Sequence, residues 1–233
     1  MPTAPLLSPE MAARRAAFRE LLMARRSCRA YRPDPVDPPI LDDILEMAQR
    51  TASWCNTQPW QVVITRGEST ARFRAALAAE MARPGGASDF PFPSRYEGIY
   101  LQRRRESGFA LYNAVGVARG DKEGAERQSA ENLRFFGAPH AAIVTTSKEL
   151  GVYGAIDCGA WVSNFMLAAA AYGVASIGQA YLARRPDFLR QYFNFPADRL
   201  VVCGISFGYS DEEHPANSFR TDREAIAKAV RIV

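Results

Sequence analysis

The chain has 233 residues, of which 48% are hydrophobic and 23% charged, and its formal net charge is +4 at pH 7. These values fit a globular protein with one substantial core, while four scattered cysteines and two histidines exclude a disulfide scaffold and a zinc centre. The basic residues are mostly arginines mixed with acidic residues, and we find no signal peptide or membrane span. We therefore expect a cytoplasmic protein that binds anionic small molecules, with no nucleic acid or membrane as partner.

The N-terminal region predicts two helices joined by a proline-rich connector. Ser8 is a suitable N-cap with proline after it, and apolar residues continue at helical spacing to about position 25. Prolines between positions 33 and 39 force an extended chain. Asp37 is expected to cap a second helix, whose apolar stripe runs from Ile40 to Ala48.

The remaining pattern predicts further strands and helices. Strands are expected at 61–65, 140–146, 174–177 and 200–207, and helices at 68–82, at 155–172 and from Pro186 onward. The helix at 155–172 is apolar nearly all round, which indicates burial or a subunit interface. Residues 84–124 are the least regular part, and there a lid over a binding site and a small satellite core are equally open interpretations. Because no repeat or linker interrupts it, we expect 1–233 to form one domain.

The run Arg25-Arg26-Ser27-Cys28-Arg29 gathers three guanidinium groups and a hydroxyl at the predicted end of the first helix. Arginine offers forked donors that match phosphate oxygens, and it does not lose its charge. The run therefore predicts a phosphate site, with a solvated surface patch as the alternative.

The run Ser53-Trp54-Cys55-Asn56-Thr57-Gln58-Pro59-Trp60 places two amides beside rigid or flat side chains. Asn56 and Gln58 have the donors and acceptors to bind the polar edge of a heterocycle. A tight turn in which both amides satisfy backbone groups is the alternative. A phosphate site together with a site for a planar polar ring is typical of a protein that binds a mononucleotide or a flavin.

Several common catalytic motifs are missing. We find no G-x-G-x-x-G, no phosphate-binding G-x-x-x-x-G-K-[ST] and no G-x-S-x-G elbow. His140 opens a predicted strand, and His214 lies in a polar loop, so neither is expected to be catalytic. A chain poor in acids and bases still supports redox chemistry when a cofactor supplies the electrons.

The two runs resemble the FMN-dependent nitroreductase family, and four further segments extend the resemblance over nearly the whole chain. These segments are Phe135–Pro139, Gly173–Gln179, Leu200–Gly208 and Asn217–Thr221. The resemblance implies an α+β fold in three layers, with a mixed central sheet flanked by helices. It also implies an intertwined homodimer with two FMN sites at the subunit interface.

The resemblance assigns the phosphate end of the cofactor to arginines. Arg25, Arg26 and Ser27 would hold the FMN phosphate and ribityl end, and Arg220 would join them from the C-terminal part of the chain. Arg29 would lie near the flavin pyrimidine, where a fixed cation favours the reduced anion.

The resemblance also assigns contacts to the flavin ring. Asn56 and Gln58 would contact the isoalloxazine or ribityl chain from the partner subunit. The backbone around Ile177, Gly178 and Gln179 matches the segment that donates a hydrogen bond to flavin N5.

Two positions depart from the common family pattern. Ala52 replaces a proline that often precedes the serine of the second run, and Ser163-Asn164 stand where many members have Gln-Asn or Gln-Ser. Ala52 is expected to loosen the loop without removing its contacts. Ser163-Asn164 would affect the subunit interface or the substrate cavity, which leaves the choice of substrate open.

The activity implied is reduction of a nitroaromatic, such as a nitrobenzoate, with NADH or NADPH as electron donor and ping-pong kinetics. The same fold acting on quinones, enals, flavins or halogenated substrates is an alternative, and so is a non-catalytic FMN-binding protein. A nucleic-acid-binding protein is a third alternative, motivated by the basic charge alone.

Overall fold

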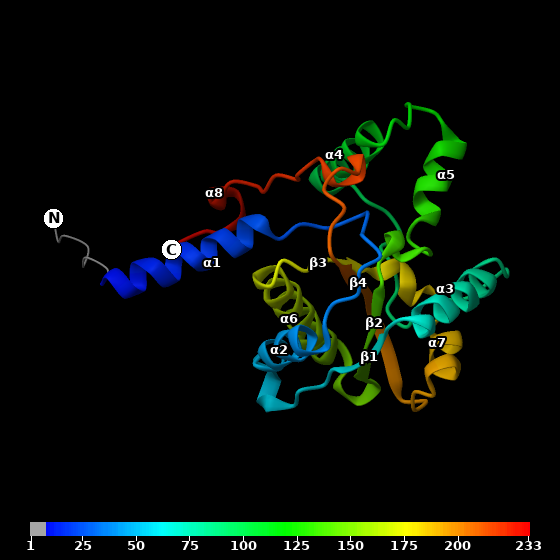
Figure 1. The fold of residues 1–233 in the computed structure, drawn as a ribbon, viewed down its shortest axis with the longest axis horizontal. Helices are drawn as coiled ribbons and strands as arrows, with labels where there is room; N and C mark the ends of the chain where they lie inside the picture. The colour runs from blue at the N-terminus through cyan, green and yellow to red at the C-terminus, as the bar shows by residue number, and fades with distance from the viewer. Residues whose placement is uncertain (1–7) are drawn as a thin grey trace.

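The computed structural model describes residues 8–233, and its centre is a four-stranded sheet (Figure 1). The strands are β1 (Gln61–Thr65), β2 (His140–Ser147), β3 (Ala175–Gln179) and β4 (Arg199–Gly208), in the order β1-β2-β4-β3. All neighbouring strands are antiparallel. β2 and β4 form the middle of the sheet and are mostly buried, because helices cover both of its faces.

The described part of the chain contains eight α-helices. They are α1 (Pro9–Ala24), α2 (Pro38–Gln49), α3 (Glu68–Met81), α4 (Gly98–Ala114), α5 (Lys122–Ala130), α6 (Gly151–Ala171), α7 (Pro186–Phe193) and α8 (Ile226–Ala229). None of these helices is long and apolar enough to cross a membrane.

Side chains alternate between the two faces of the sheet and contribute to two separate cores. Ala142 and Val144 of β2 pack in a core with α2 and α6, whereas Ile143 between them packs with α3 and α7. The layers are helix, sheet and helix, with α2 and α6 on one side and α3 and α7 on the other (Figure 1). The predicted α+β class and three-layer arrangement are confirmed.

The sheet differs from the expected mixed sheet, because its four strands are all antiparallel. Parallel pairing among the described residues is confined to one bridge, between Ser27 and Ser176. The segment after α1 meets β3 at this single point before it turns to an antiparallel bridge between Tyr31 and Ser210. A single bridge is too short to count as a strand.

α6 begins at Gly151, four residues earlier than expected, and ends before Gly173, whose φ of +69° suits the helix terminus that was predicted there. One side of α6 is buried in the core. Along its first turns, Val152, Tyr153 and Ile156 are more than half exposed. The helix that was predicted to be apolar nearly all round therefore has one buried face and one exposed apolar stripe.

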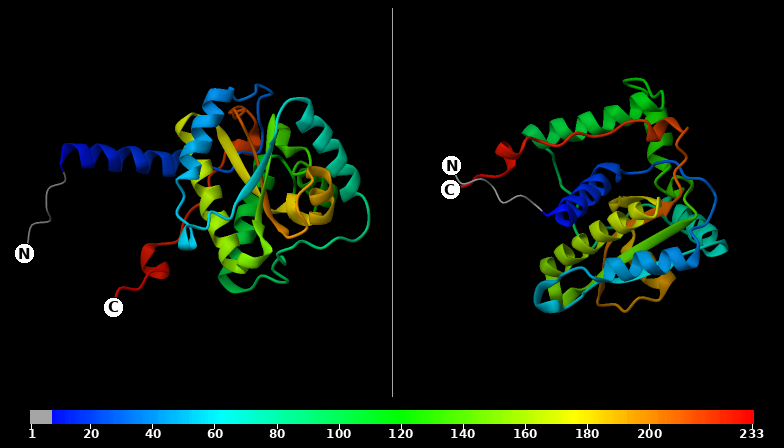
Figure 2. Two further views of the ribbon diagram at one scale, coloured as in Figure 1. Left: turned by 90° about the horizontal axis from the view of Figure 1, so that it is seen from below. Right: turned by 60° about the vertical axis from the view of Figure 1, so that its left-hand side comes forward.

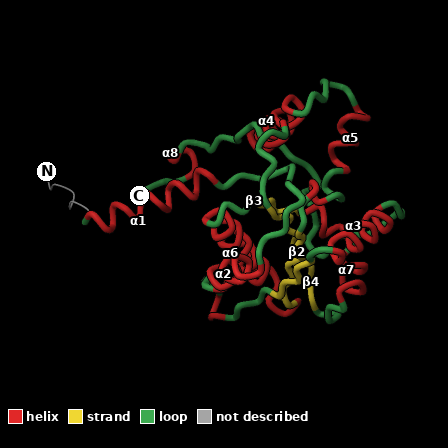
Figure 3. The backbone as a smooth tube through the Cα atoms, viewed as in Figure 1, coloured by secondary structure: helices red, strands yellow, loops and turns green. Residues whose placement is uncertain are grey.

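α1 projects from the rest of the molecule, as Figure 2 shows. The Ser8 hydroxyl accepts a hydrogen bond from the Met11 N–H at 3.2 Å, so the predicted cap is present. No residue of α1 is buried, and Phe18, Leu22 and Met23 are exposed. The C-terminal segment after β4 runs as a loop past α4 and returns to the side from which α1 projects (Figure 3).

Candidate functional site

The end of α1, the segment after it and the C-terminal segment enclose a cavity of about 460 Å³, which we call the arginine pocket. The guanidinium-bearing residues that line it are Arg25, Arg26, Arg29, Arg220 and Arg223. The uncharged polar residues that line it are Ser27, Thr221 and, from α4, Ser107, and Asp222 is the one acidic residue that lines it. The structure therefore brings together arginines that are nearly two hundred positions apart in sequence.

Most of these arginines lack a counterion. Arg26 forms an ion pair with Glu212 and lies 3.4 Å from the Ser210 hydroxyl oxygen. Within the described residues, none of the other four arginines forms an ion pair; those that donate hydrogen bonds do so to carbonyl or hydroxyl oxygens. Residues 1–7 contain no aspartate or glutamate either. The pocket therefore has an excess of positive charge and attracts an anion.

Burial makes this charge costly without an anion. Burial lowers the pKa of Arg25, and the facing positive charge of Arg223 lowers it further. Burial likewise lowers the pKa of Arg29. A bound dianion would offset both effects, since it supplies the missing counter-charge.

Arg29 is held on two sides. Its guanidinium lies over the ring of Phe219, 5.7 Å from the ring centroid, and its Nη1 donates to the Ser27 carbonyl at 3.3 Å. Its backbone N–H donates to Asn217 Oδ1 at 2.7 Å. These contacts keep the cation at the boundary between the arginine pocket and a second cavity, which it also lines.

The second cavity, of about 310 Å³, lies along the free edge of β3 and will be called the edge cavity. Ile177, Gly178 and Gln179 line one side, and Leu111 and Tyr112 of α4 line another. Its volume and its mixed aromatic, apolar and polar lining suit part of a planar ring system.

Gly178 presents its backbone to the edge cavity. The Cys28 N–H donates to the Ser176 carbonyl at 3.2 Å, so the polar groups of Ser176 face away from β4. In a strand, residues two apart have their N–H and C=O groups on the same edge, so those of Gly178 face the cavity too. The geometry suits a backbone donor at this position.

The side chain of Gln179, in contrast, is used within the fold. It is buried, its Oε1 accepts from the Ser206 hydroxyl, and its Nε2 donates to the Asn132 carbonyl at 3.1 Å. Any contact of Gln179 with a ligand therefore comes from its backbone.

The loop 53–60, here called the amide loop, has an unusual backbone. Cys55, Asn56 and Gln58 all have positive φ angles, between 46° and 55°. Non-glycine residues in this region cost energy and cluster at functional sites. Both amide side chains are exposed. The tight-turn alternative is met in part, because Gln58 Nε2 donates to the Asn56 carbonyl at 3.2 Å and Gln58 Oε1 accepts from Gln49 Nε2 at 3.3 Å. The turn alone does not explain the positive φ angles at three of four neighbouring positions.

Contacts with α6 hold the amide loop in this shape. Asp157 Oδ2 accepts from the Trp54 N–H at 3.1 Å, and the ring of Trp54 lies 5.1 Å from that of Tyr153. Ser53 Oγ accepts from the Gln58 N–H at 2.9 Å. The loop is therefore anchored at the beginning of α6.

The amide loop and the arginine pocket lie at opposite ends of α6. Arg25 and Arg26 lie beside Ala170 and Gly173, at the C-terminal end of the helix. A helix of 21 residues is about 30 Å long. Within one chain, Asn56 and Gln58 are thus far from the arginines.

α4 is the part of 84–124 that covers these cavities. It contributes Ser107 to the arginine pocket, Leu111 and Tyr112 to the edge cavity, and Arg103 to a third cavity of about 610 Å³ against the C-terminal segment. Because none of its residues is buried, the satellite-core interpretation does not apply to α4.

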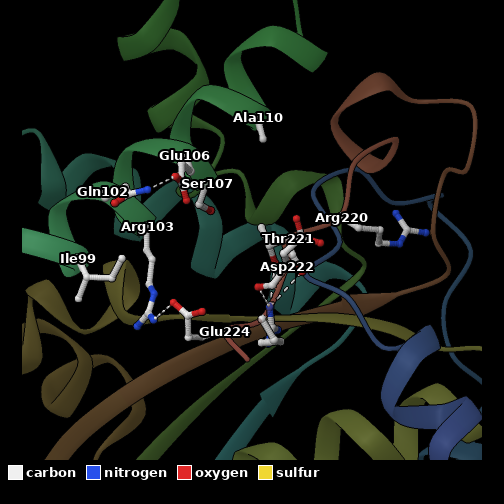
Figure 4. A pocket seen from close by; sticks show the side chains of 11 residues that line it. Ile99, Gln102, Arg103, Glu106, Ser107, Ala110, Arg220, Thr221, Asp222 and Glu224 are labelled. Carbon is white, nitrogen blue, oxygen red and sulfur yellow. Dashed lines mark hydrogen bonds and ion pairs between the residues drawn. The ribbon is translucent and has the colours of Figure 1, made fainter. Parts of the chain in front are cut away.

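Figure 4 shows the side chains that line the third cavity, which come from α4 and from the C-terminal segment. Arg103 Nη2 and Glu224 Oε2 pair at 2.9 Å across the third cavity, whereas the side chain of Arg220 points away from them. Residues 220–223 line both cavities, whereas Glu224 lines only the third.

The two histidines have structural roles. Buried His140 accepts from the Val36 N–H at 2.9 Å through Nε2, and burial lowers its pKa. His214 is exposed and accepts from the Ala216 N–H at 3.2 Å. The described residues contain no group of acids, cysteines and histidines that would hold a metal.

Residues 22–209 match the model of the nitroreductase family. The chain belongs to this family. Nitroreductase NfnB of Mycolicibacterium smegmatis is 34% identical over 232 residues, which make up 99% of this chain and 97% of that protein. The 4-nitrobenzoate reductase of Pseudomonas putida is 30% identical over 207 residues, 89% of this chain and 91% of that protein.

Solved nitroreductases have the same fold. The crystal structure of FMN-dependent nitroreductase NfnB from Mycobacterium smegmatis, in complex with NADPH, matches with a TM-score of 0.88 and 34% identity. The match covers 94% of this chain and 99% of that one. The FMN and NADPH-dependent nitroreductase NfnB from Sphigopyxis sp. strain HMH also matches with a TM-score of 0.88, at 33% identity. The family predicted from the sequence is confirmed.

The sequence did not predict the roles of three residues at this nitroreductase's candidate site. They are Asn217, which forms several hydrogen bonds, Phe219, which lies against Arg29, and Arg223. Arg223 carried a usable signal, because it lies two residues after the segment Asn217–Thr221 that resembles the family. The positions of Asn217 and Phe219 relative to Arg29 carried none, since both depend on contacts across the fold.

Proposed function

We propose that this protein is an FMN-dependent oxidoreductase that takes hydride from NADH or NADPH and reduces a nitroaromatic acceptor, and that 1–233 form one FMN-binding domain. The observation that carries the proposal is the arginine pocket, with four arginines lacking acidic partners, which meets at Arg29 an edge cavity open to the Gly178 backbone. A phosphate at one end and a flat heterocycle at the other match FMN. The relatives described above support the same cofactors.

The arginines divide into two roles. Arg25 and Arg220, helped by Arg26 and the Ser27 hydroxyl, hold the phosphate through charge-assisted hydrogen bonds. Arg29 lies toward the edge cavity and stabilises negative charge on the pyrimidine side of the ring. The backbone at 177–179 provides a fixed hydrogen-bond donor for the central ring, with Gly178 as the exposed position.

FMN, when bound, would supply the two-electron chemistry that no side chain of this site provides. The chain's own residues bind and orient it. α4 reduces the access of water from the side of Leu111 and Tyr112.

We further propose that the protein is a homodimer and that Asn56 and Gln58 act on the site of the partner subunit. The amide loop is exposed, and its strained backbone is already formed within one chain, yet it is far from the arginines of that chain. Exposed apolar residues of α1 and α6 are suited to a subunit interface, namely Phe18, Leu22, Met23, Val152, Tyr153 and Ile156. A second copy that covers these residues would place its own amide loop near the site of this chain.

The acceptor we favour is a nitrobenzoate or a related nitroarene, because a cationic site suits an aromatic acid. Donor and acceptor would occupy the edge cavity in turn. This predicts ping-pong kinetics, and intersecting lines in initial-rate plots would contradict it.

The direct test is the visible absorption spectrum of the purified protein before and after anaerobic addition of NADH or NADPH. A yellow protein that bleaches, and that regains its colour with a nitroarene, supports the proposal. A yellow protein that stays oxidised indicates a non-catalytic flavin-binding protein. A colourless protein that does not take up FMN contradicts the proposal. Parallel assays with a quinone separate the alternative acceptors.

A further inference from the structure

Asn217 connects the two segments that form the arginine pocket. Its side chain is 4% exposed, and all of its polar atoms are used. Oδ1 accepts from the Arg29 N–H at 2.7 Å. Nδ2 donates to the carbonyls of Ala30 at 2.9 Å and Asp211 at 2.8 Å, and it lies 3.3 Å from Ser210 Oγ.

The residues that Asn217 connects carry the cations of the site. Arg29 is bonded through its own backbone, and its guanidinium lies over Phe219, two residues after Asn217. Arg220 Nη1 donates to the carbonyls of Asn217 and Phe219, each at 3.0 Å. One buried side chain therefore sets the separation between Arg29 on the N-terminal side and Arg220 on the C-terminal side.

Only an amide fulfils this role. The site requires one acceptor, for the Arg29 N–H, and donors for two carbonyls and a hydroxyl. Aspartate has the same shape and keeps the acceptor, but it places a carboxylate against the two carbonyls. Alanine leaves every partner without a bond in a buried place, where unpaired polar groups are costly.

We propose that Asn217 is a positioning residue that holds Arg29 and Arg220 at the spacing needed to bind FMN. The inference rests on the proposed function, because it assumes that Arg29 and Arg220 bind the same FMN molecule. Asn217 itself need not touch the cofactor. Its contribution passes through the backbone of Arg29 and the segment 217–220.

The experiment compares full-length variants Asn217→Ala, Asn217→Asp and Asn217→Ser with the wild type and with Thr70→Ala. Thr70 is a matched control, since it is 2% exposed and its Oγ1 donates to Thr65 Oγ1 at 3.0 Å, remote from the pocket. The measurements are the melting temperature of each apoprotein and the Kd for FMN well below it, obtained from flavin fluorescence. The Kd is measured over a series of salt concentrations.

The positioning role predicts that Asn217→Ala and Asn217→Asp raise the Kd for FMN at least about tenfold, whereas Thr70→Ala leaves it within about twofold. The salt dependence of the Kd should also flatten in the Asn217 variants, because displaced arginines interact less with the phosphate. Asn217→Ser should lie between wild type and alanine, and it carries the test if the other variants do not fold.

A Kd and a salt dependence like those of the wild type, in any folded Asn217 variant, would overturn the inference and leave Asn217 a purely structural residue. Failure of the wild-type protein itself to bind FMN would instead contradict the proposed function. The two failures are therefore distinguishable.

Discussion

The arginine pocket and the amide loop differ in how they reach a working form. The pocket is assembled from residues 25–29 and 217–223, which meet through the tertiary fold of one chain. The amide loop is one continuous run of residues, which Ser53 and, from α6, Asp157 hold in a strained shape, with Asn56 and Gln58 exposed. The first region gathers positive charge within one chain, whereas the second has exposed amides that lie far from those charges.

Under the proposed function, this difference assigns different roles to the two subunits of a dimer. A single chain collects the charges proposed to bind the phosphate. The amide loop contacts α6 at Asp157, about 20 Å along the helix from Ala170 beside the arginines, so we propose that its amides act in a second copy. The following experiments test this contrast.

The largest effect is expected from Arg220→Ala. Charge-assisted hydrogen bonds contribute about 1.5–3 kcal/mol each, so the Kd for FMN should rise by about 10- to 100-fold. Arg25→Ala should act in the same direction. Arg72→Ala is the control, because Arg72 is an exposed arginine paired with Glu68 at 3.1 Å. Equal Kd values for Arg220→Ala and Arg72→Ala would remove Arg220 from the site.

Mixed dimers test whether the amide loop serves the partner. Dimers that pair an Arg220→Ala chain with an Asn56→Ala chain should retain one intact site, and thus half of the wild-type flavin and activity. The control places both substitutions in one chain, paired with a wild-type chain. If the amides act across the interface, this control has no intact site, whereas action within one chain reverses the two results.

Asp157→Ala tests how the loop is held. Loss of the acceptor for the Trp54 N–H should lower the free energy of unfolding by about 1–2 kcal/mol. Asp157→Asn, which keeps an acceptor oxygen, should lower it by less. Chemical denaturation measures both. The amide-loop interpretation also requires weaker flavin binding by the alanine variant, and unchanged binding would argue against it.

The rates at which the cysteines react test both regions, and here we expect the smallest effect. Cys55 in the amide loop is exposed, whereas Cys28 beside the pocket and Cys158 in the core are buried. Alkylation of the native protein at pH 8, followed by mass spectrometry, should therefore modify Cys55 first. If a partner and FMN cover the amide loop, added FMN should slow this modification. Equal rates with and without FMN would argue against a covered loop.

Cys158 also predicts a pH dependence of stability. Burial raises the pKa of its thiol to about 11, so the folded protein keeps this proton while the unfolded chain loses it above pH 9. The free energy of unfolding should fall between pH 9 and 11, by at most about 1.4 kcal/mol per pH unit from this group. Cys158→Ala should flatten that slope. An unchanged slope in this variant would contradict the assignment.

Local signals predicted the elements well. β1 was expected at 61–65 and lies there, and the Ser8 cap and the helix that begins at Pro186 are also present. The sheet was less predictable, since strand order and direction depend on contacts between distant segments. For the same reason, the run at 25–29 indicated a phosphate site but not its depth or the contribution of α4.

Short runs in the sequence identified the family by resemblance, and the resemblance implied the three-layer fold and the candidate site residues. Helix caps and hydrophobic periodicity, which act over a few residues, predicted the individual helices and strands. The tertiary structure alone decided that Asn217 joins Arg29 to Arg220, that Gly178 lies at a free sheet edge, and that the amide loop is remote from the arginines of its chain. These relations depend on how the chain crosses itself over nearly two hundred residues, and no local pattern encodes such distances.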